Sequence, residues 1–417
     1  MKKLMMILLA AAMMLGGCTA QGINKESPAS QAENHRAVLA QQSIAPLNSS
    51  FGSAVNGFGL DAAKRLYNAE ENLALSPASI ELALCMTRTG AGGDTANEMA
   101  QTLGVSDLSD REIIEACKSL MWRANTGGME AANAIWLSDA YTFKDDFVDT
   151  CTGDFFADAF PLKIPGAKDA INEWADEKTH GRIKDIIAQE LPEETRIVLA
   201  NALYYLGEWE LPFEANDTWD DEFTAPFGSV TAAFMHSDWS VPYYKNDDFS
   251  MITLDFKSKD DEGKYAMAFL LPTEGTSVND MLQSLDADIF SNALKADKQE
   301  VWIKLPKFEF SYFSKLKDTL AAMGIQKALS PDEADFSRMT NEENVIYIDE
   351  VLHKCYIRVD ELGAEAAAVT AVMMAGAAMP QDEPPKFYAD RPFVFAIYSQ
   401  EDGAIAFLGA VNDPTKE

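Results

Sequence analysis

The sequence has few of the residues, and none of the short motifs, that mark the common enzyme classes. Its 417 residues include only four histidines, at positions 35, 180, 236 and 353. It contains no His-Glu-x-x-His of a zinc protease, no Gly-x-Ser-x-Gly of a serine hydrolase and no Gly-x-Gly-x-x-Gly of a dinucleotide-binding turn. We therefore predict that the chain is not an enzyme.

Cysteine is also scarce, and its spacing does not suit a metal. No Cys-x-x-Cys occurs, so the pattern of a zinc site or a redox pair is missing. Of the five cysteines, Cys85 and Cys355 lie in apolar runs, where a buried free thiol is the usual outcome. We expect no metal, no cofactor and no required disulfide.

Basic residues are few compared with acidic ones. The 34 Lys and Arg against 66 Asp and Glu give a formal net charge of −32. This charge repels phosphate backbones, so nucleic acid is not an expected partner. With 47% hydrophobic and 10% aromatic residues the chain can bury a large core, and its length alone would suggest two or three domains.

The apolar run at the N-terminus is too short for a comfortable membrane span. Two lysines precede it and small residues end it at Cys18, which predicts a signal peptide over residues 1–17. The segment from Leu15 to Cys18 resembles a bacterial lipoprotein signal, in which the cysteine carries the lipid; secretion with the cysteine cut away is the alternative. Residues 18–50 are polar and favour a flexible tether, with the folded part outside the cell membrane or extracellular.

Helix and strand patterns are mixed along the rest of the chain. Ser76 can cap a helix that begins with Pro77, and the run DAINEWADEKTHG is typical of an amphipathic helix. RIVLANALYYLGEW is too continuously apolar for a strand with one wet face, which favours the centre of a sheet covered on both sides. VWIKLPKFEF alternates as one strand, a helix follows it up to Gly324, and PFVFAIY with AIAFLGAV predicts a hairpin. The class is α+β.

One segment, GAEAAAVTAVMMAGAAMP over residues 363–380, fits no single element. It lacks Lys and Arg, and its small residues would suit a helix. Val369, Thr370 and Val372 favour a strand instead, and Gly376 suits neither. A permanent helix or a plain linker does not explain this composition.

Five segments, in order, carry a resemblance to the serpin family. They are LSPASI, NALYYLGEWELPF, VLHKCYIRVDELGAEAAAVTA, ADRPFVFAI and FLGAVNDP. The resemblance implies one α+β domain over residues 51–414, with three β-sheets and eight or nine helices. It also implies an exposed reactive-centre loop over about residues 361–383, which overrides the expectation of several domains from length.

The resemblance implies that the chain is a suicide inhibitor of serine endopeptidases. In the family a protease cleaves the loop, is held as an acyl-enzyme, and is trapped when the loop inserts as a new strand, a general example of β-augmentation and strain release. Alternate side chains of such a strand face the core. One such set here is small or apolar, namely Ala364, Ala366, Ala368, Thr370, Val372, Met374 and Gly376.

The hinge of the loop decides between inhibitory and non-inhibitory members of the family. Glu361 and Gly363 match it, Glu365 falls on the outward face, and no charge, Pro or bulky group occupies an inward position. Inhibition is therefore favoured over a ligand carrier or chaperone, with a surface adhesin third. The predicted hinge residues are Glu361, Gly363, Ala364, Glu365, Ala366, Ala367 and Ala368.

Other positions match a polar cluster bridging the two strands that must part. By resemblance these are Ser76, Asn201 and His353, with Ser79 one helical turn from Ser76. Buried hydrogen bonds of this kind contribute about 1 kcal/mol each and would control how readily the sheet opens. Trp209 matches the tryptophan beneath the point where insertion starts.

The reactive bond is predicted between Ala377 and Ala378 by counting the family's usual length from the hinge. Met374 and Met379 are the alternatives, and counting back from RPF points near Gln381. The window over residues 372–379 holds only Val, Met, Ala and Gly, which suits elastase-like or subtilisin-like proteases with a small or shallow apolar pocket and not trypsin-like ones. We expect a monomer that meets the membrane only through a lipid on Cys18.

Overall fold

The computed structural model describes residues 47–126, 129–205, 207–258, 263–342, 346–364 and 383–416. In this part of the chain nine α-helices and three β-sheets form, as predicted. The helices are α2 (Ser49–Leu66), α3 (Pro77–Thr89), α4 (Gly93–Thr102), α5 (Asp110–Thr126), α6 (Asp145–Gly153), α7 (Ala167–Lys178), α8 (Val278–Ser284), α9 (Ala287–Ala293) and α10 (Lys317–Met323).

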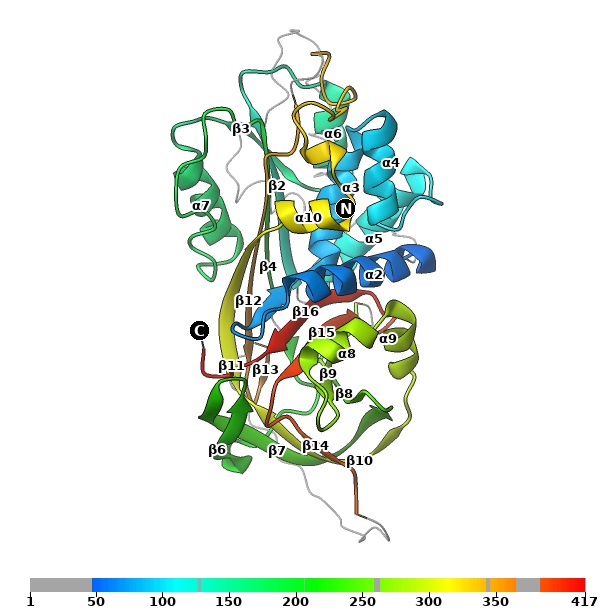
Figure 1. Cartoon of the computed structure of the whole chain (residues 1–417), viewed down its shortest axis with the longest axis vertical. Coiled ribbons are helices and arrows are strands. Elements are labelled where there is room, and N and C mark those ends of the chain that lie inside the picture. Colours follow the sequence, from blue (N-terminus) through cyan, green and yellow to red (C-terminus); the bar gives the residue numbers. More distant parts are fainter. Residues whose placement is uncertain are drawn as a thin grey trace, which may run out of the picture.

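A five-stranded sheet runs along the long axis of the molecule (Figure 1). Its order is β11-β12-β4-β2-β3, so β4 lies at its centre. The strand IVLANALYY forms β4, and each of its described side chains is buried, as the continuous apolar run predicts. The strands are β2 (Met129–Ser138), β3 (Asp158–Leu162), β4 (Ile197–Tyr205), β11 (Phe308–Lys315) and β12 (Glu350–Val359).

Helices cover both faces of this sheet. In Figure 1 α7 lies alone on one side of the strands, and α2, α3 and α5 lie on the other. The buried face of α7, with Ile171 and Trp174, packs against Ala134 of β2 and Val198 of β4. Because the sheet is covered on both faces, a strand added to it must pass between two packed layers.

A nine-stranded sheet occupies the other end of the molecule. Its order is β1-β16-β15-β9-β8-β7-β10-β14, with β6 paired to β7, and a third sheet pairs β13 with β5. These strands are β1 (Leu73–Leu75), β5 (Gly207–Glu208), β6 (Thr218–Ala225), β7 (Gly228–Lys245), β8 (Phe249–Asp255), β9 (Tyr265–Pro272), β10 (Lys298–Pro306), β13 (Gly363–Ala364), β14 (Lys386–Tyr388), β15 (Phe393–Ser399) and β16 (Ile405–Val411).

Several local predictions are confirmed and one is wrong. Ser76 caps α3, α10 ends just before Gly324, and β15 pairs antiparallel with β16 as a hairpin. The run VWIKLPKFEF is not one strand: β10 ends at Pro306 in the nine-stranded sheet, and β11 begins at Phe308 in the five-stranded sheet. β11 buries alternate side chains, whereas residues 303–306 of β10 are all buried, and the run of apolar residues does not mark the break at Lys307 between the two strands.

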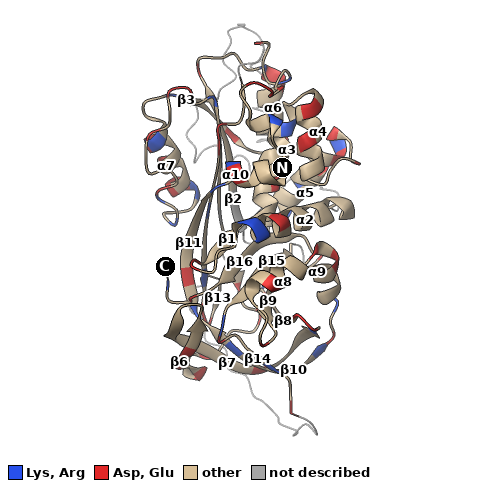
Figure 2. Ribbon diagram, in the orientation of Figure 1, with Lys and Arg blue, Asp and Glu red and all other residues tan. Residues whose placement is uncertain are grey.

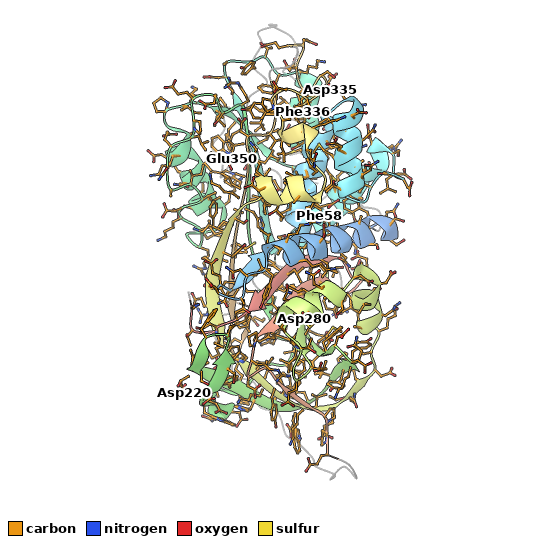
Figure 3. The ribbon with its side chains drawn as sticks, in the orientation of Figure 1. Phe58, Asp220, Asp280, Asp335, Phe336 and Glu350 are labelled. Atoms are coloured by element: carbon orange, nitrogen blue, oxygen red, sulfur yellow. The ribbon has the colours of Figure 1, made fainter. Side chains whose placement is uncertain are left out.

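Charged residues lie mainly on edge strands and helix surfaces. Figure 2 shows acidic residues on β6, whereas β4 carries none. Asp220 of β6, labelled in Figure 3, lies at the end of the molecule away from Asp335. Among the described helices, none combines the length and apolar character needed to cross a membrane.

Candidate functional site

In the five-stranded sheet β11 and β12 form one antiparallel pair, and β4 and β2 form another. These two pairs adjoin where β12 lies next to β4, and there the neighbouring strands are parallel. Residues 198–204 of β4 pair in parallel with residues 350–356 of β12, and we call this junction the seam. Outside it, β2 pairs antiparallel with β4, and β11 pairs antiparallel with β12. A strand running antiparallel to both would therefore fit the seam and replace the parallel pairing of β4 with β12 by two antiparallel pairings, while β2 and β3 stay parallel.

His353 and Asn201 face each other across the middle of the seam. The His353 Nδ1–H donates to Asn201 Oδ1 at 3.0 Å, because Nε2 accepts the Ser76 backbone N–H at 3.0 Å. Burial lowers the pKa of the fully buried His353 imidazole to about 3. The ring is therefore neutral at physiological pH and joins both strands to the start of α3.

Further hydrogen bonds complete a buried polar cluster at the seam. The Ser76 hydroxyl donates to the Ala406 carbonyl at 2.7 Å, and the Ser79 backbone N–H donates to the Ser76 hydroxyl at 3.2 Å. The Asn201 amide donates to the Ser79 hydroxyl and, at 2.5 Å, to Asn133 Oδ1 of β2. The structure thus brings together the four residues predicted for this cluster and adds Asn133.

Sequence reasoning missed Asn133 although one signal was present. The residue lies inside the run AANAIWL, where an amide has no obvious partner, and it is 5% exposed. A buried amide requires hydrogen bonds, so its place in an apolar strand indicates a polar partner on a neighbouring strand. The polar cluster is hereafter Ser76, Ser79, Asn133, Asn201 and His353.

Trp209 fastens the turn that follows β12. Its ring is 1% exposed and stacks on Phe256, with 4.5 Å between ring centroids. The indole N–H donates to the Asp360 carbonyl at 2.9 Å, and the Trp209 backbone N–H donates to the Leu362 carbonyl at 2.8 Å. Trp209 therefore lies against the turn from which the loop starts.

Glu361 is held at the same turn by both its backbone and its side chain. Its carbonyl accepts the Phe213 N–H at 2.8 Å, and its carboxylate pairs with the Lys307 ammonium at 2.8 Å. Burial raises the pKa of the Glu361 carboxyl, but the hydrogen bonds that the carboxylate accepts, the strongest of them from Lys307, together with the Lys307 charge outweigh burial, so the pKa lies below its ordinary value. These contacts fix the base of the loop before any cleavage.

Gly363 and Ala364, near the start of the loop, already form a strand. Gly363 pairs with Glu208 and Ala364 with Gly207, antiparallel to β5, which follows β4 in the chain. Gly363 has a φ of +150°, and a Cβ there would lie 1.9 Å from the Gly207 carbonyl oxygen, so only glycine fits. The chain therefore turns back toward the seam immediately after β12.

The expectation that Ala364 is exposed before cleavage is wrong. Ala364 is 1% exposed and belongs to the cluster of buried aromatic and aliphatic side chains that includes Trp209 and Phe256. The reason is the pairing with β5, which turns the methyl group inward. The predictions at Glu365, Ala366, Ala367, Ala368, Met374, Ala377, Ala378, Met379 and Cys18 lie outside the described residues.

The four cysteines in the described part of the chain are free thiols without solvent access. Cys85, Cys117, Cys151 and Cys355 are all buried, and the Cys355 thiol lies 3.0 Å from His353 Nε2. Burial raises the pKa of the Cys355 thiol well above its ordinary value, which keeps it protonated. Within the ranges that the structure describes, no group of three His, Cys, Asp or Glu is placed to hold a metal ion.

A family model described as "Serpin (serine protease inhibitor)" matches residues 53–414. A serpin-like protein of Thermococcus kodakarensis is 36% identical, with 87% of this chain and 85% of that protein covered. A wheat serpin (Triticum aestivum) is 30% identical, covering 83% of this chain and 91% of its own length. The match therefore extends over almost all of the folded part.

Solved structures agree with the sequence matches. The thermophilic serpin tengpin in its native state superposes with a TM-score of 0.81 at 30% identity, covering 89% of this chain and 96% of its own. Human thyroxine-binding globulin in complex with thyroxine gives a TM-score of 0.77 at 26% identity, covering 88% and 98%.

Proposed function

This chain belongs to the serpin family, and from that premise we propose that it inhibits serine endopeptidases by inserting its cleaved loop into the seam. Serpins are generally protease inhibitors and not catalysts. The observation that carries the proposal is β13, because Gly363 and Ala364 already pair antiparallel with β5, the strand that follows β4 in the chain. Insertion then needs the same pairing to continue down the seam.

The pairing with β5 sets the register of the inserted strand. Ala364 lies opposite Gly207. If each further loop residue pairs with the preceding residue of β4, Thr370 comes to lie opposite Asn201. An inward-facing hydroxyl would then meet the polar cluster, where it can take over a hydrogen bond.

The turn after β12 gives the register on the other flank. Asp360 forms an antiparallel bridge with Gly363. Continued along β12, the same register brings Thr370 opposite His353. The two flanks agree, because His353 and Asn201 are paired to each other in the closed seam. The loop therefore has the length and phase to fill the seam without a bulge.

The depth of insertion supports the predicted reactive bond. β4 begins at Ile197, and the same register brings Met374 opposite it. The bond between Ala377 and Ala378 then lies just beyond the end of the inserted strand. A protease esterified to Ala377 would be drawn to the far end of the sheet.

The chemistry belongs to the protease, and this chain supplies the conformational change. The protease serine attacks the carbonyl of the residue before the bond, the amine of the next residue leaves, and an ester joins the two proteins. Insertion must displace the protease before water hydrolyses that ester. The native state is thus kinetically trapped, and the free energy released when the loop inserts drives the displacement of the protease.

The residues around the predicted reactive bond favour elastase-like or subtilisin-like proteases. Small and apolar side chains over residues 372–379 suit a small or shallow specificity pocket, and a trypsin-like pocket requires Lys or Arg. The signal peptide and Leu15 to Cys18 support a bacterial, exported protein held by a lipid on Cys18, with the inhibitor outside the cell. The N-terminal residues 18–50 would act as its tether.

Mixing the protein with a panel of serine proteases tests the proposal. Denaturing gels should show a band at the summed mass of the two proteins less the released C-terminal peptide with an elastase-like enzyme, and no such band with trypsin. A ligand carrier would show only the clipped loop, and the human relative in complex with thyroxine makes this the relevant alternative. A surface adhesin would show neither product.

A further inference from the structure

The two strands of the seam are also joined at the end that lies away from β13. Asp349 directly precedes β12, and Arg196 directly precedes β4. Glu350, the first residue of β12, is labelled in the upper half of Figure 3, whereas Figure 1 shows β13 in the lower half of the same view. A loop strand that starts at β13 therefore reaches Asp349 last.

A side chain from the start of β12 bonds to the backbone at the start of β4. The Asp349 carboxylate oxygen Oδ2 accepts the Arg196 backbone N–H at 2.7 Å and the Ile197 backbone N–H at 3.2 Å. Because Asp349 is 9% exposed and Ile197 is fully buried, water cannot readily replace these bonds. We call Asp349, Arg196 and Ile197 the clasp.

The charge of the Asp349 carboxylate adds to the strength of the clasp. Burial raises the pKa of this carboxyl, whereas the two backbone N–H groups, the Tyr347 hydroxyl and the nearby Lys317 ammonium favour its charged form. Hydrogen bonds that a charged carboxylate accepts are about twice as strong as hydrogen bonds between neutral groups. The clasp is therefore a stronger link between the strands than two ordinary backbone hydrogen bonds.

Both registers of the inserted strand lead to the clasp. The register set by β5 brings Met374 opposite Ile197. The register set by the turn after β12 brings the same residue opposite Asp349. Neighbouring strands lie about 4.8 Å apart, so an added strand moves Asp349 away from Ile197 by about that distance. Hydrogen bonds of 2.7 and 3.2 Å cannot span this shift, so both must break before Met374 can enter.

We propose that the clasp is the last barrier to loop insertion and that Asp349 determines whether insertion is completed. A loop that passed the polar cluster but stopped before Met374 would leave the ester at Ala377 short of the far end of the sheet. Water could then hydrolyse the ester before the protease is fully displaced. The inference rests on the proposed function, because it concerns the final part of the same insertion.

Two synthetic peptides test the clasp without any protease. One has the sequence of residues 364–376 and extends past the clasp, and the other has residues 364–371 and ends before it. Each is mixed with the uncut full chain, and native mass spectrometry follows the complex over time. Asp349→Ala removes the acceptor, so uptake of the long peptide should be about tenfold faster than in the wild type, and uptake of the short peptide should not change. Asp349→Asn keeps an acceptor oxygen without the charge and should give an intermediate rate for the long peptide.

Glu350→Ala is the matched control. The Glu350 carboxylate pairs with Lys315 of β11 at 3.3 Å, on the side of β12 away from β4. This variant should take up both peptides at the wild-type rates. Long-peptide uptake at the wild-type rate in both Asp349 variants, an equal gain for the two peptides, or an equal gain in Glu350→Ala would overturn the role of the clasp alone. No uptake of the long peptide by any variant would overturn insertion itself, and the clasp with it.

Discussion

Cutting the loop near Ala377 should make this protein more stable, whereas most nicked proteins become less stable. A zinc metalloprotease is the suitable tool, because it activates water directly and forms no acyl-enzyme that could be trapped. The cut frees the loop from β14 and lets residues 365–374 enter the seam. The expected result is a higher unfolding temperature.

The structure sets the size of this effect. Insertion replaces the parallel ladder between β4 and β12 with two antiparallel ladders, a net gain of one ladder over about ten residues. At about 1 kcal/mol per hydrogen bond the gain is about 10 kcal/mol, before the cost of ordering the loop. If half of this free energy remains after that cost, and the unfolding entropy is about 2 cal/mol/K per residue, the unfolding temperature rises by at least about 6 °C.

Differential scanning calorimetry of intact and cut protein measures the shift. Thr370→Arg is the control. The protease should cut this variant normally, but its unfolding temperature should not rise, because insertion would bury an unpaired charge against the polar cluster. Thr370→Val keeps the shape of the side chain, so the unfolding temperature of this variant should still rise after the cut. An unfolding temperature that falls or stays constant in the cut wild type would refute insertion into the seam.

Three further predictions concern the hinge, the polar cluster and the reactive bond. Ala364→Arg should lower the unfolding temperature of the uncut protein, because the site is already buried, and should turn the inhibitor into a substrate with a raised stoichiometry of inhibition; an unchanged stoichiometry would contradict the hinge assignment. Because the pKa of His353 falls from about 6.5 unfolded to about 3 folded, the unfolded chain binds an extra proton between these values. Stability should therefore be lost as pH falls below 6.5, by about 1.4 kcal/mol per pH unit more than in His353→Gln, as urea titrations from pH 7 to pH 4.5 can show. Ala377→Arg should shift complex formation on gels from elastase-like to trypsin-like proteases, and a variant that keeps the original preference would place the bond elsewhere.

Local features of the sequence predicted much of the fold because their causes are local. The Ser76 cap depends on a backbone N–H only a turn away, and the end of α10 depends on Gly324. The central strand was predictable because burial on both faces leaves a continuous apolar run. The break after Pro306 was not predictable, since buried apolar residues continue on both sides of it.

The candidate site depended more on partners far apart in the chain. Asn133 and Asn201 meet only through the pairing of β2 with β4, so their contact follows from strand register and not from spacing. The burial of Ala364 was missed because a family resemblance describes the loop as a whole. Ala364 is buried because it pairs with Gly207 of β5, and this pairing follows from the folded arrangement of the two strands.

The most direct test of the central claim is the chemistry of the trapped complex. The wild-type protein is incubated with an elastase-like serine protease, boiled in detergent and separated, and both products are identified by mass spectrometry. The account predicts an ester-linked complex that survives boiling and a released C-terminal peptide that begins at Ala378. A peptide beginning at Met379 would move the bond by one residue and keep the mechanism. Cleavage in this window without any stable complex would contradict the account.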